Sequence, residues 1–273
     1  MNLLNLELIS FWTALVGYSV ATMIALWALV FVRKPEKSLL ALMTVAFLLH
    51  TAAIGLRWVR IDHFPVVNMF EMLSANVWGL MAAVVVGYWR LPNMRAFAAM
   101  VLPVVMLVLA WMLLLQRTDS TFPPTYHTVW LFIHIAFIKL FLGCAFIALG
   151  ISGIVLFSSA GIGISRFARL PDDFALDKTA YRCMGLGLIF DTLGIMAGAI
   201  WAQDAWGRYW SWDRLEVWSL LTWLSIGLTL HVRKPFNTSV RTNALLVLAT
   251  WVVAFFTFFG LPFVSTALHK GMI

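Results

Sequence analysis

Apolar residues fill eight long runs of the chain, and short polar segments separate them. Each run has about the 17–25 residues that an α-helix needs to cross the hydrocarbon core of a bilayer. A lipid-facing backbone must satisfy its own hydrogen bonds, and no run alternates apolar and polar positions as a barrel strand does, so we predict helices. The predicted spans are 8–32, 39–58, 72–89, 96–115, 129–157, 184–201, 215–232 and 244–264.

The composition supports a membrane protein. Hydrophobic residues make up 62% of the chain and charged residues 11%, against roughly a quarter charged in soluble domains. This excludes a soluble globular protein. We expect an all-α polytopic membrane protein with one domain over residues 1–273. Glu7 precedes the first run and no small-residue cleavage site follows it, which favours a permanent span over a signal peptide.

Basic residues fall unevenly on alternate loops, and Lys and Arg are enriched on the cytoplasmic side of membrane proteins. Twelve lie in one set of loops: Arg33, Lys34, Lys37, Arg90, Arg95, Arg166, Arg169, Lys178, Arg182, Arg233, Lys234 and Arg241. Six lie in the other: Arg57, Arg60, Arg117, Arg208, Arg214 and Lys270. The bias predicts both termini outside. It also accounts for the net charge of +7 without a nucleic-acid partner.

The two cysteines, Cys144 and Cys183, lie in or beside apolar runs, and the chain has no CxxC or CxxCH motif. The sequence therefore has no covalent haem attachment site, zinc pattern or disulfide framework of its own. We expect both thiols to pack as small apolar groups.

Three histidines are candidate metal ligands, because histidine is the commonest one. His134 lies about 8 Å below the outer surface of the fifth predicted span, and His269 follows the eighth span on the same side. His231 lies roughly 24 Å along the seventh span, too far away to share their ligand. The alternative for each is a histidine at the membrane interface, bonded to water or backbone.

The other three histidines are less specific. His50 lies in the middle of the second predicted span, where a hydrogen bond to a neighbouring helix and metal ligation are both open. His63 and His127 lie in outer loops and could be simple surface residues. A fifth helix that began early would place His127 on the same face as His134.

The stretch WGRYWSWDRLEVW is the most specific feature of the chain. Its tryptophans could be ordinary membrane-interface anchors. Their density, with arginine and carboxylate residues interleaved, favours a platform for a large planar ligand instead. Flat rings stack on a macrocycle, arginines pair with its carboxylates, and outer histidines can ligate a central iron.

The segment resembles the Trp-rich WWD signature of the haem-handling proteins of cytochrome c biogenesis. The whole chain resembles the CcsA (ResC) family of the System II cytochrome c synthase. The likeness includes HTAAIGLRW, HFPVVNMFE, WLFIH, GAIWAQDAWGRYWSWD, EVWSLLTW and FVSTALH, in this order.

The resemblance implies a function and a set of site residues. Haem b would be the transported ligand, with His134 and His269 as outer axial ligands. His231 would be a ligand within the membrane, paired with a histidine of a CcsB (ResB) partner subunit. The implied haem contacts are Trp206, Arg208, Trp210, Trp212, Asp213, Trp218 and Arg57.

The implied process is presentation of haem on the periplasmic face of a bacterial plasma membrane, where CxxCH cysteines of apocytochrome c form thioethers. No residue is an evident general base or nucleophile. We therefore expect a subunit of a synthase complex rather than an enzyme on its own.

Two departures from the family pattern affect local geometry. The usual WDPKE is replaced by Asp213-Arg214-Leu215-Glu216, which removes a proline that favours the first helical turn. Lys270 and Gly271 follow His269, where Ser-Tyr is more usual.

Other functions remain open. The haem relay CcmC usually has six helices, and the HemX-type regulators share the fold. A transporter of a non-haem substrate would favour paired broken helices or an inverted repeat, neither of which is evident. A quinone-linked oxidoreductase would reduce haem with a quinol, independently of apocytochrome.

Overall fold

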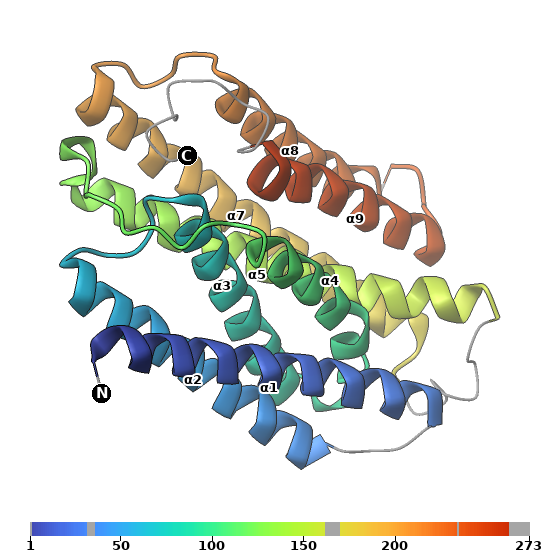
Figure 1. Ribbon diagram of the computed structural model, residues 1–273. Coiled ribbons are helices and arrows are strands. Elements are labelled where there is room, and N and C mark those ends of the chain that lie inside the picture. The colour runs from blue at the N-terminus through green and yellow to red at the C-terminus, as the bar shows by residue number, and fades with distance from the viewer. Residues whose placement is uncertain (1, 32–35, 162–169, 234, 262–273) are drawn as a thin grey trace.

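The computed structural model describes residues 2–31, 36–161, 170–233 and 235–261, and over these residues the regular secondary structure consists of helices alone (Figure 1). This confirms the predicted all-α membrane fold. The main helices are α1 (Leu3–Phe31), α2 (Glu36–Ile61), α3 (Met69–Arg90), α4 (Phe97–Met112), α5 (Val129–Ser159), α7 (Asp173–Trp206), α8 (Arg214–Val232) and α9 (Val240–Phe255). Short 3₁₀ turns lie at Pro92–Met94 (η1) and Pro124–Tyr126 (η2), and a π-helical turn, Phe256–Gly260 (η3), continues α9.

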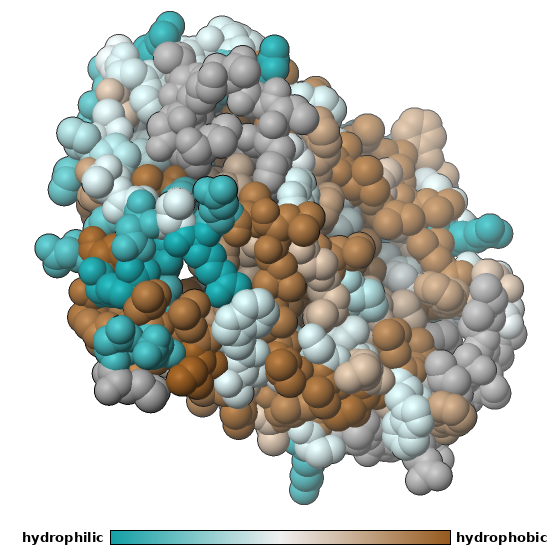
Figure 2. Space-filling view, in the orientation of Figure 1, coloured by the Kyte–Doolittle hydropathy of each residue, from teal (hydrophilic) through white to brown (hydrophobic). Residues whose placement is uncertain are grey.

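Seven of these helical segments are long and apolar enough to cross a membrane. The remaining helix, α4, has 16 residues and contains Pro103, so it is about 24 Å long. Hydrophobic residues cover much of the face seen in Figure 2, while hydrophilic ones gather on the side where α1 begins. This distribution is typical of a bundle whose middle faces lipid.

Successive long helices run in opposite directions, so alternate loops gather at opposite ends of the bundle (Figure 1). One end carries loops 62–68, 113–128 and 207–213, and we call it the Trp end. The basic loop 91–96 lies at the opposite end. The predicted outward orientation of the Trp end rests on the charge bias alone and stays a prediction.

The start of α7 differs from the predicted span 184–201, whereas the start of α5 agrees with the predicted span 129–157. The helix α7 already begins at Asp173, because the Asp172 carboxylate caps it by accepting from the Ala175 N–H at 2.7 Å. The helix α5 begins at Val129, directly after its cap Thr128, and not earlier. His127 therefore lies outside α5, and it does not share a helical face with His134.

Polar side chains inside the bundle bond across helices. His50 is 1% exposed; its Nδ1 lies 3.3 Å from the Tyr18 hydroxyl on α1 and its Nε2 lies 3.0 Å from the Ser74 hydroxyl on α3. Of the two roles left open for His50, the structure therefore shows the interhelical hydrogen bond. Lys139 of α5 similarly donates to Asn76 of α3. These bonds fix α1, α2, α3 and α5 relative to one another.

Candidate functional site

A cavity opens among α5, α7 and α8 near the Trp end, with an empty volume of about 520 Å³. Its lining includes His134 of α5, Trp201 of α7, Trp210 of the connecting segment and Glu216 of α8. Two of the predicted site residues, His134 and Trp210, thus share one cavity although 76 positions separate them in sequence. Aromatic and aliphatic walls with a few polar groups are typical of a site for a large organic ligand.

His134 is the sixth residue of α5 and is partly buried. Its Nδ1 lies 2.7 Å from the carbonyl oxygen of Gly194 on α7. A carbonyl can only accept, so Nδ1 carries the proton and the lone pair of the ring lies on Nε2. The ring is also stacked on Trp201, with centroids 6.2 Å apart and planes inclined by 24°. A neutral histidine in this tautomer can ligate a metal through Nε2.

The segment that carries Trp210 is shaped by a helix end and a helix start. Gly207 ends α7 in the left-handed conformation, with φ of 75°, which glycine adopts without strain. Asp213 then caps α8, since its carboxylate accepts from the Glu216 N–H at 2.9 Å while Glu216 accepts in return from the Asp213 N–H. This capping box starts the helix without the proline of the usual family pattern.

Glu216 also holds the segment between α7 and α8 by hydrogen bonds to Ser211. Its carboxylate accepts from the Ser211 backbone N–H at 2.7 Å and from the Ser211 hydroxyl at 3.0 Å. The Asp-Arg-Leu-Glu departure therefore keeps an ordered turn into α8, and one side chain of that turn lines the cavity.

The four tryptophans of the segment do not form one continuous stack. Trp210 lines the cavity and meets Trp212 edge to face at 5.9 Å, while Trp212 is 71% exposed. Trp206 packs against Trp201 with centroids 5.1 Å apart, and Trp218 packs against Phe256 of η3 at 4.6 Å. In the part of the chain that is described, Trp210 and Trp212 are therefore the members of the set placed to contact a ligand.

His231 lies far from this cavity, close to the opposite end of α8. It is exposed and follows Leu221, Leu224 and Leu228, which are 41%, 49% and 61% exposed. Spacings of three and four place these four side chains on one helix face. His231 therefore points away from the bundle, as a residue does that meets lipid or another protein.

The remaining predicted iron ligand, His269, lies outside the described residues. Arg208 is exposed in the segment between α7 and α8. Among the described residues, no three metal-ligating side chains cluster as a metal site. His134 and His231 therefore do not belong to one metal site of the described chain: His134 lies near the Trp end and His231 near the opposite end of α8.

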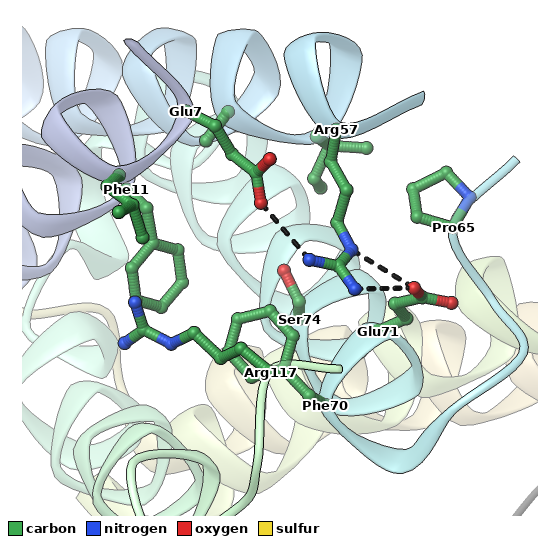
Figure 3. A pocket seen from close by; sticks show the side chains of 11 residues that line it. Glu7, Phe11, Arg57, Pro65, Phe70, Glu71, Ser74 and Arg117 are labelled. Carbon is green, nitrogen blue, oxygen red and sulfur yellow. Dashed lines mark hydrogen bonds and ion pairs between the residues drawn. The ribbon is translucent and has the colours of Figure 1, made fainter. Parts of the chain in front are cut away.

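Arg57 lines a second cavity at the Trp end, with an empty volume of about 370 Å³ (Figure 3). Its guanidinium donates to Glu71 at 3.0 and 2.8 Å, to Glu7 at 3.2 Å and to the Thr118 carbonyl at 2.7 Å. Both carboxylates are buried. The structure thus places Arg57 in an interhelical ion-pair network rather than in the cavity with His134.

Two sequence comparisons agree on a family. The model of the "Cytochrome C assembly protein" family matches residues 66–269 of the chain. The chain belongs to this family. The matched range contains His134, the Trp-rich segment, His231 and His269, whereas Glu7, His50 and Arg57 precede it.

Individual relatives agree with the family assignment. The cytochrome c biogenesis protein CcsA of Guillardia theta is 28% identical over 290 residues, which cover 98% of this chain and 92% of that protein. CcsA of Prochlorococcus marinus (strain MIT 9515) is 30% identical over 241 residues, or 78% of this chain and 77% of the relative.

A solved structure of the cytochrome c haem lyase CcmF has the same fold. It superposes with a TM-score of 0.74 at 16% identity over 95% of this chain. The chain spans 47% of that protein, so the likeness shows a shared fold within a longer molecule.

The site contains residues that the sequence interpretation did not single out. Trp201, Gly194 and Gly198 surround His134 on the α7 side, and GIMAGAIW contains the small-x-x-x-small pattern that allows close helix packing. Glu71 lies at the end of the HFPVVNMFE motif, where Asn68 and Glu71 have the spacing of a capping box.

A loop cation completes the second cavity. The Arg117 guanidinium lies 4.6 Å from the ring centroids of Phe11 and Trp12 and 5.2 Å from that of Phe70. Burial lowers the pKa of Arg117. Such cation–π contacts stabilise a desolvated guanidinium, and they tie loop 113–128 to α1 and α3.

Proposed function

We propose that the chain is a haem-handling subunit of a cytochrome c synthase. The single observation that carries the proposal is the placement of His134: its Nδ1 lies 2.7 Å from the Gly194 carbonyl, and its side chain lines one cavity with Trp210 of the family's Trp-rich segment. The family assignment and the names of the relatives favour cytochrome c assembly over a transporter of another substrate.

Haem b is the substrate in this proposal, and the chain's contribution is to hold it in position. His134 would bind the iron through Nε2, with His269 as the opposite ligand. Trp210 and Trp212 would contact the macrocycle. The CxxCH cysteines of apocytochrome c then add across the vinyl groups: each S–C bond forms at one vinyl carbon and the thiol hydrogen ends on the other. Because the bound haem holds each vinyl group in line with a thiol, a large part of the entropic barrier to thioether formation is removed.

Three of the implied haem contacts lie further from the cavity. Trp206, Trp218 and Asp213 support the segment through Trp201, Phe256 and Glu216. Under the proposal these residues shape the platform, whereas Arg208 is exposed where it could pair with a haem carboxylate.

A second haem location at His231 requires another protein. Because His231 lies on the exposed face of α8, a second axial ligand on that face would come from outside the bundle. A histidine of a CcsB-type membrane subunit is the partner that we propose. The host membrane would be a bacterial plasma membrane with the Trp end toward the periplasm, as the charge bias predicts.

The test is the absorption spectrum of the protein purified with and without a CcsB-type subunit. The expected result, after chemical reduction of the protein, is a spectrum with a Soret band and sharp α and β bands. These bands should weaken in His134→Ala. His127→Ala is the matched control, because His127 also lies at the Trp end but is exposed and packs on Phe122. A colourless protein in both preparations, or equal loss in the two variants, would reject the proposal and favour a non-haem substrate.

A further inference from the structure

We propose that Gly194, Gly198 and Trp201 of α7 form a seat that positions His134 as an iron ligand. The idea rests on the proposed function for the identity of the ligand, but the seat itself is a property of the chain. All three are positioning residues, since they would act on haem only through His134.

Gly198 is required for the close approach of the imidazole. A Cβ atom at this position would lie 2.7 Å from Nδ1 and 2.9 Å from Cε1 of His134. Real Cβ atoms do not approach other atoms so closely, so any larger residue would displace the ring or separate the helices. At Gly194 a Cβ would lie 2.7 Å from Cδ1 and 3.2 Å from Cγ1 of Ile138, the side chain one turn further along α5.

The close approach brings a backbone acceptor within reach. The Gly194 carbonyl accepts from Nδ1 of His134 at 2.7 Å. A backbone carbonyl cannot donate, so it selects the Nδ1–H form and leaves the ring's lone pair on Nε2. A hydrogen bond from the other ring nitrogen sets the orientation and basicity of a metal-bound histidine.

Trp201 forms the third side of the seat. It is 3% exposed and is held by its Nε1–H, which donates to the Thr125 carbonyl at 2.9 Å. Tyr126 packs edge-on against it with centroids 5.8 Å apart. Because Trp201 stacks nearly parallel to the imidazole, the ring of His134 is limited to one plane.

The competing explanation is that the glycines serve only the packing of α5 against α7. Gly185 and Gly187 on the same helix control for the addition of a methyl group to α7, and the state of the His134 ring separates the two explanations. A Cβ at Gly185 meets nothing within 4 Å, and one at Gly187 comes within 3.6 Å of Phe141, an ordinary contact. Neither position touches His134. Gly185→Ala and Gly187→Ala are therefore matched controls for Gly198→Ala.

The experiment reads the tautomer of His134 directly. The full chain, labelled with ¹⁵N-histidine and reconstituted in nanodiscs, is studied by NMR, and the His134 signals are assigned by their loss in His134→Ala. We expect a protonated Nδ1 and an unprotonated Nε2 in the wild type, in Gly185→Ala and in Gly187→Ala. In Gly198→Ala this pattern should be lost.

Haem titration of the same samples gives the functional readout. Loss of a hydrogen-bond partner of a ligating histidine typically weakens metal binding by about 10–100-fold, so Gly198→Ala should weaken haem binding at least tenfold while both controls stay near the wild type. An unchanged His134 tautomer in Gly198→Ala would overturn the seat. If the wild type binds no haem but the tautomer still depends on Gly198, the seat stands and only the proposed function fails.

A second variant covers the case in which Gly198→Ala does not accumulate. Trp201→Phe keeps an aromatic face against His134, whereas Trp201→Leu removes it. The seat predicts a larger change in the His134 signals for Trp201→Leu than for Trp201→Phe. Equal signals in the two variants would overturn it.

Discussion

Glu71 is the residue whose loss should damage the bundle most among the charged groups at the Trp end. Its side chain is fully buried, with 0% exposure. The carboxylate accepts from Arg57 at 2.8 and 3.0 Å, from the Val67 N–H at 2.9 Å and from the Ser120 hydroxyl at 3.0 Å. It also closes the capping box of α3 with Asn68. Glu71→Gln retains the size of the side chain and removes the charge.

The expected cost follows from the burial of the pair. Removal of one partner of a buried ion pair typically costs about 3–5 kcal/mol, because the other charge stays buried without compensation. The amide introduced by Glu71→Gln would in addition direct a donor toward groups that are themselves donors. Glu7 remains as a second carboxylate for Arg57 at 3.2 Å, so we expect the lower part of that range, about 3 kcal/mol.

Asp119→Asn is the matched control. It also removes a carboxylate paired with an arginine of α2, since Asp119 binds Arg60 at 2.7 Å, but the Asp119 side chain is 61% exposed. Exposed pairs contribute about 0.2–1 kcal/mol. The two substitutions thus differ in burial and not in chemistry.

The assay is reversible unfolding in mixed micelles, followed by tryptophan fluorescence. Arg57→Met, Glu71→Gln and the double variant complete a cycle, for which we expect an interaction energy of about 0.5–3 kcal/mol between the two residues. A Glu71→Gln cost no larger than that of Asp119→Asn would refute the argument. It would also reopen a direct role for Arg57 in binding a ligand.

Other consequences can be checked in the same preparations. Asp213→Ala should lower the free energy of unfolding by about 1 kcal/mol through loss of the α8 cap, and Asp213→Asn by less, as thermal unfolding would reveal. His231→Ala should change stability by no more than about 0.5 kcal/mol, because the residue is exposed, while haem content measured with the partner subunit falls. His50→Ala should lower the free energy of unfolding by about 2 kcal/mol or more, because the buried hydroxyls of Tyr18 and Ser74 lose their hydrogen-bond partner. The haem spectrum of this variant should be unchanged. Burial raises the pKa of the Tyr126 hydroxyl. The contribution of this group to the free energy of unfolding is therefore complete below about pH 10 and is lost as the pH rises above that value. In a pH series, Tyr126→Phe should reduce the loss of stability at alkaline pH.

Local sequence determined the helices and where most of them begin and end. The lengths of the apolar runs predict the spans, because a backbone in the bilayer must satisfy its own hydrogen bonds and a helix does so within one segment. Asn68-x-x-Glu71 and Asp213-x-x-Glu216 are capping signals that can be read from the chain alone. The Trp-rich segment likewise identified its own end of the bundle as the candidate site. The missed start of α7 has a similar local cause, since Asp172 is a capping residue in a charged stretch.

Tertiary structure alone decided which side chains meet. Helices that are apolar on all sides have no amphipathic face to indicate their rotation about the axis. The sequence therefore did not reveal that Arg57 binds Glu7, 50 residues earlier, or that the four tryptophans contact different neighbours. It contained both His134 and the Gly194–Gly198 pair, but only the packing of α5 on α7 brings a carbonyl to Nδ1. The close packing of side chains and glycines between two helices fixes such contacts to within a few tenths of an ångström. This packing depends on the residues of both helices together.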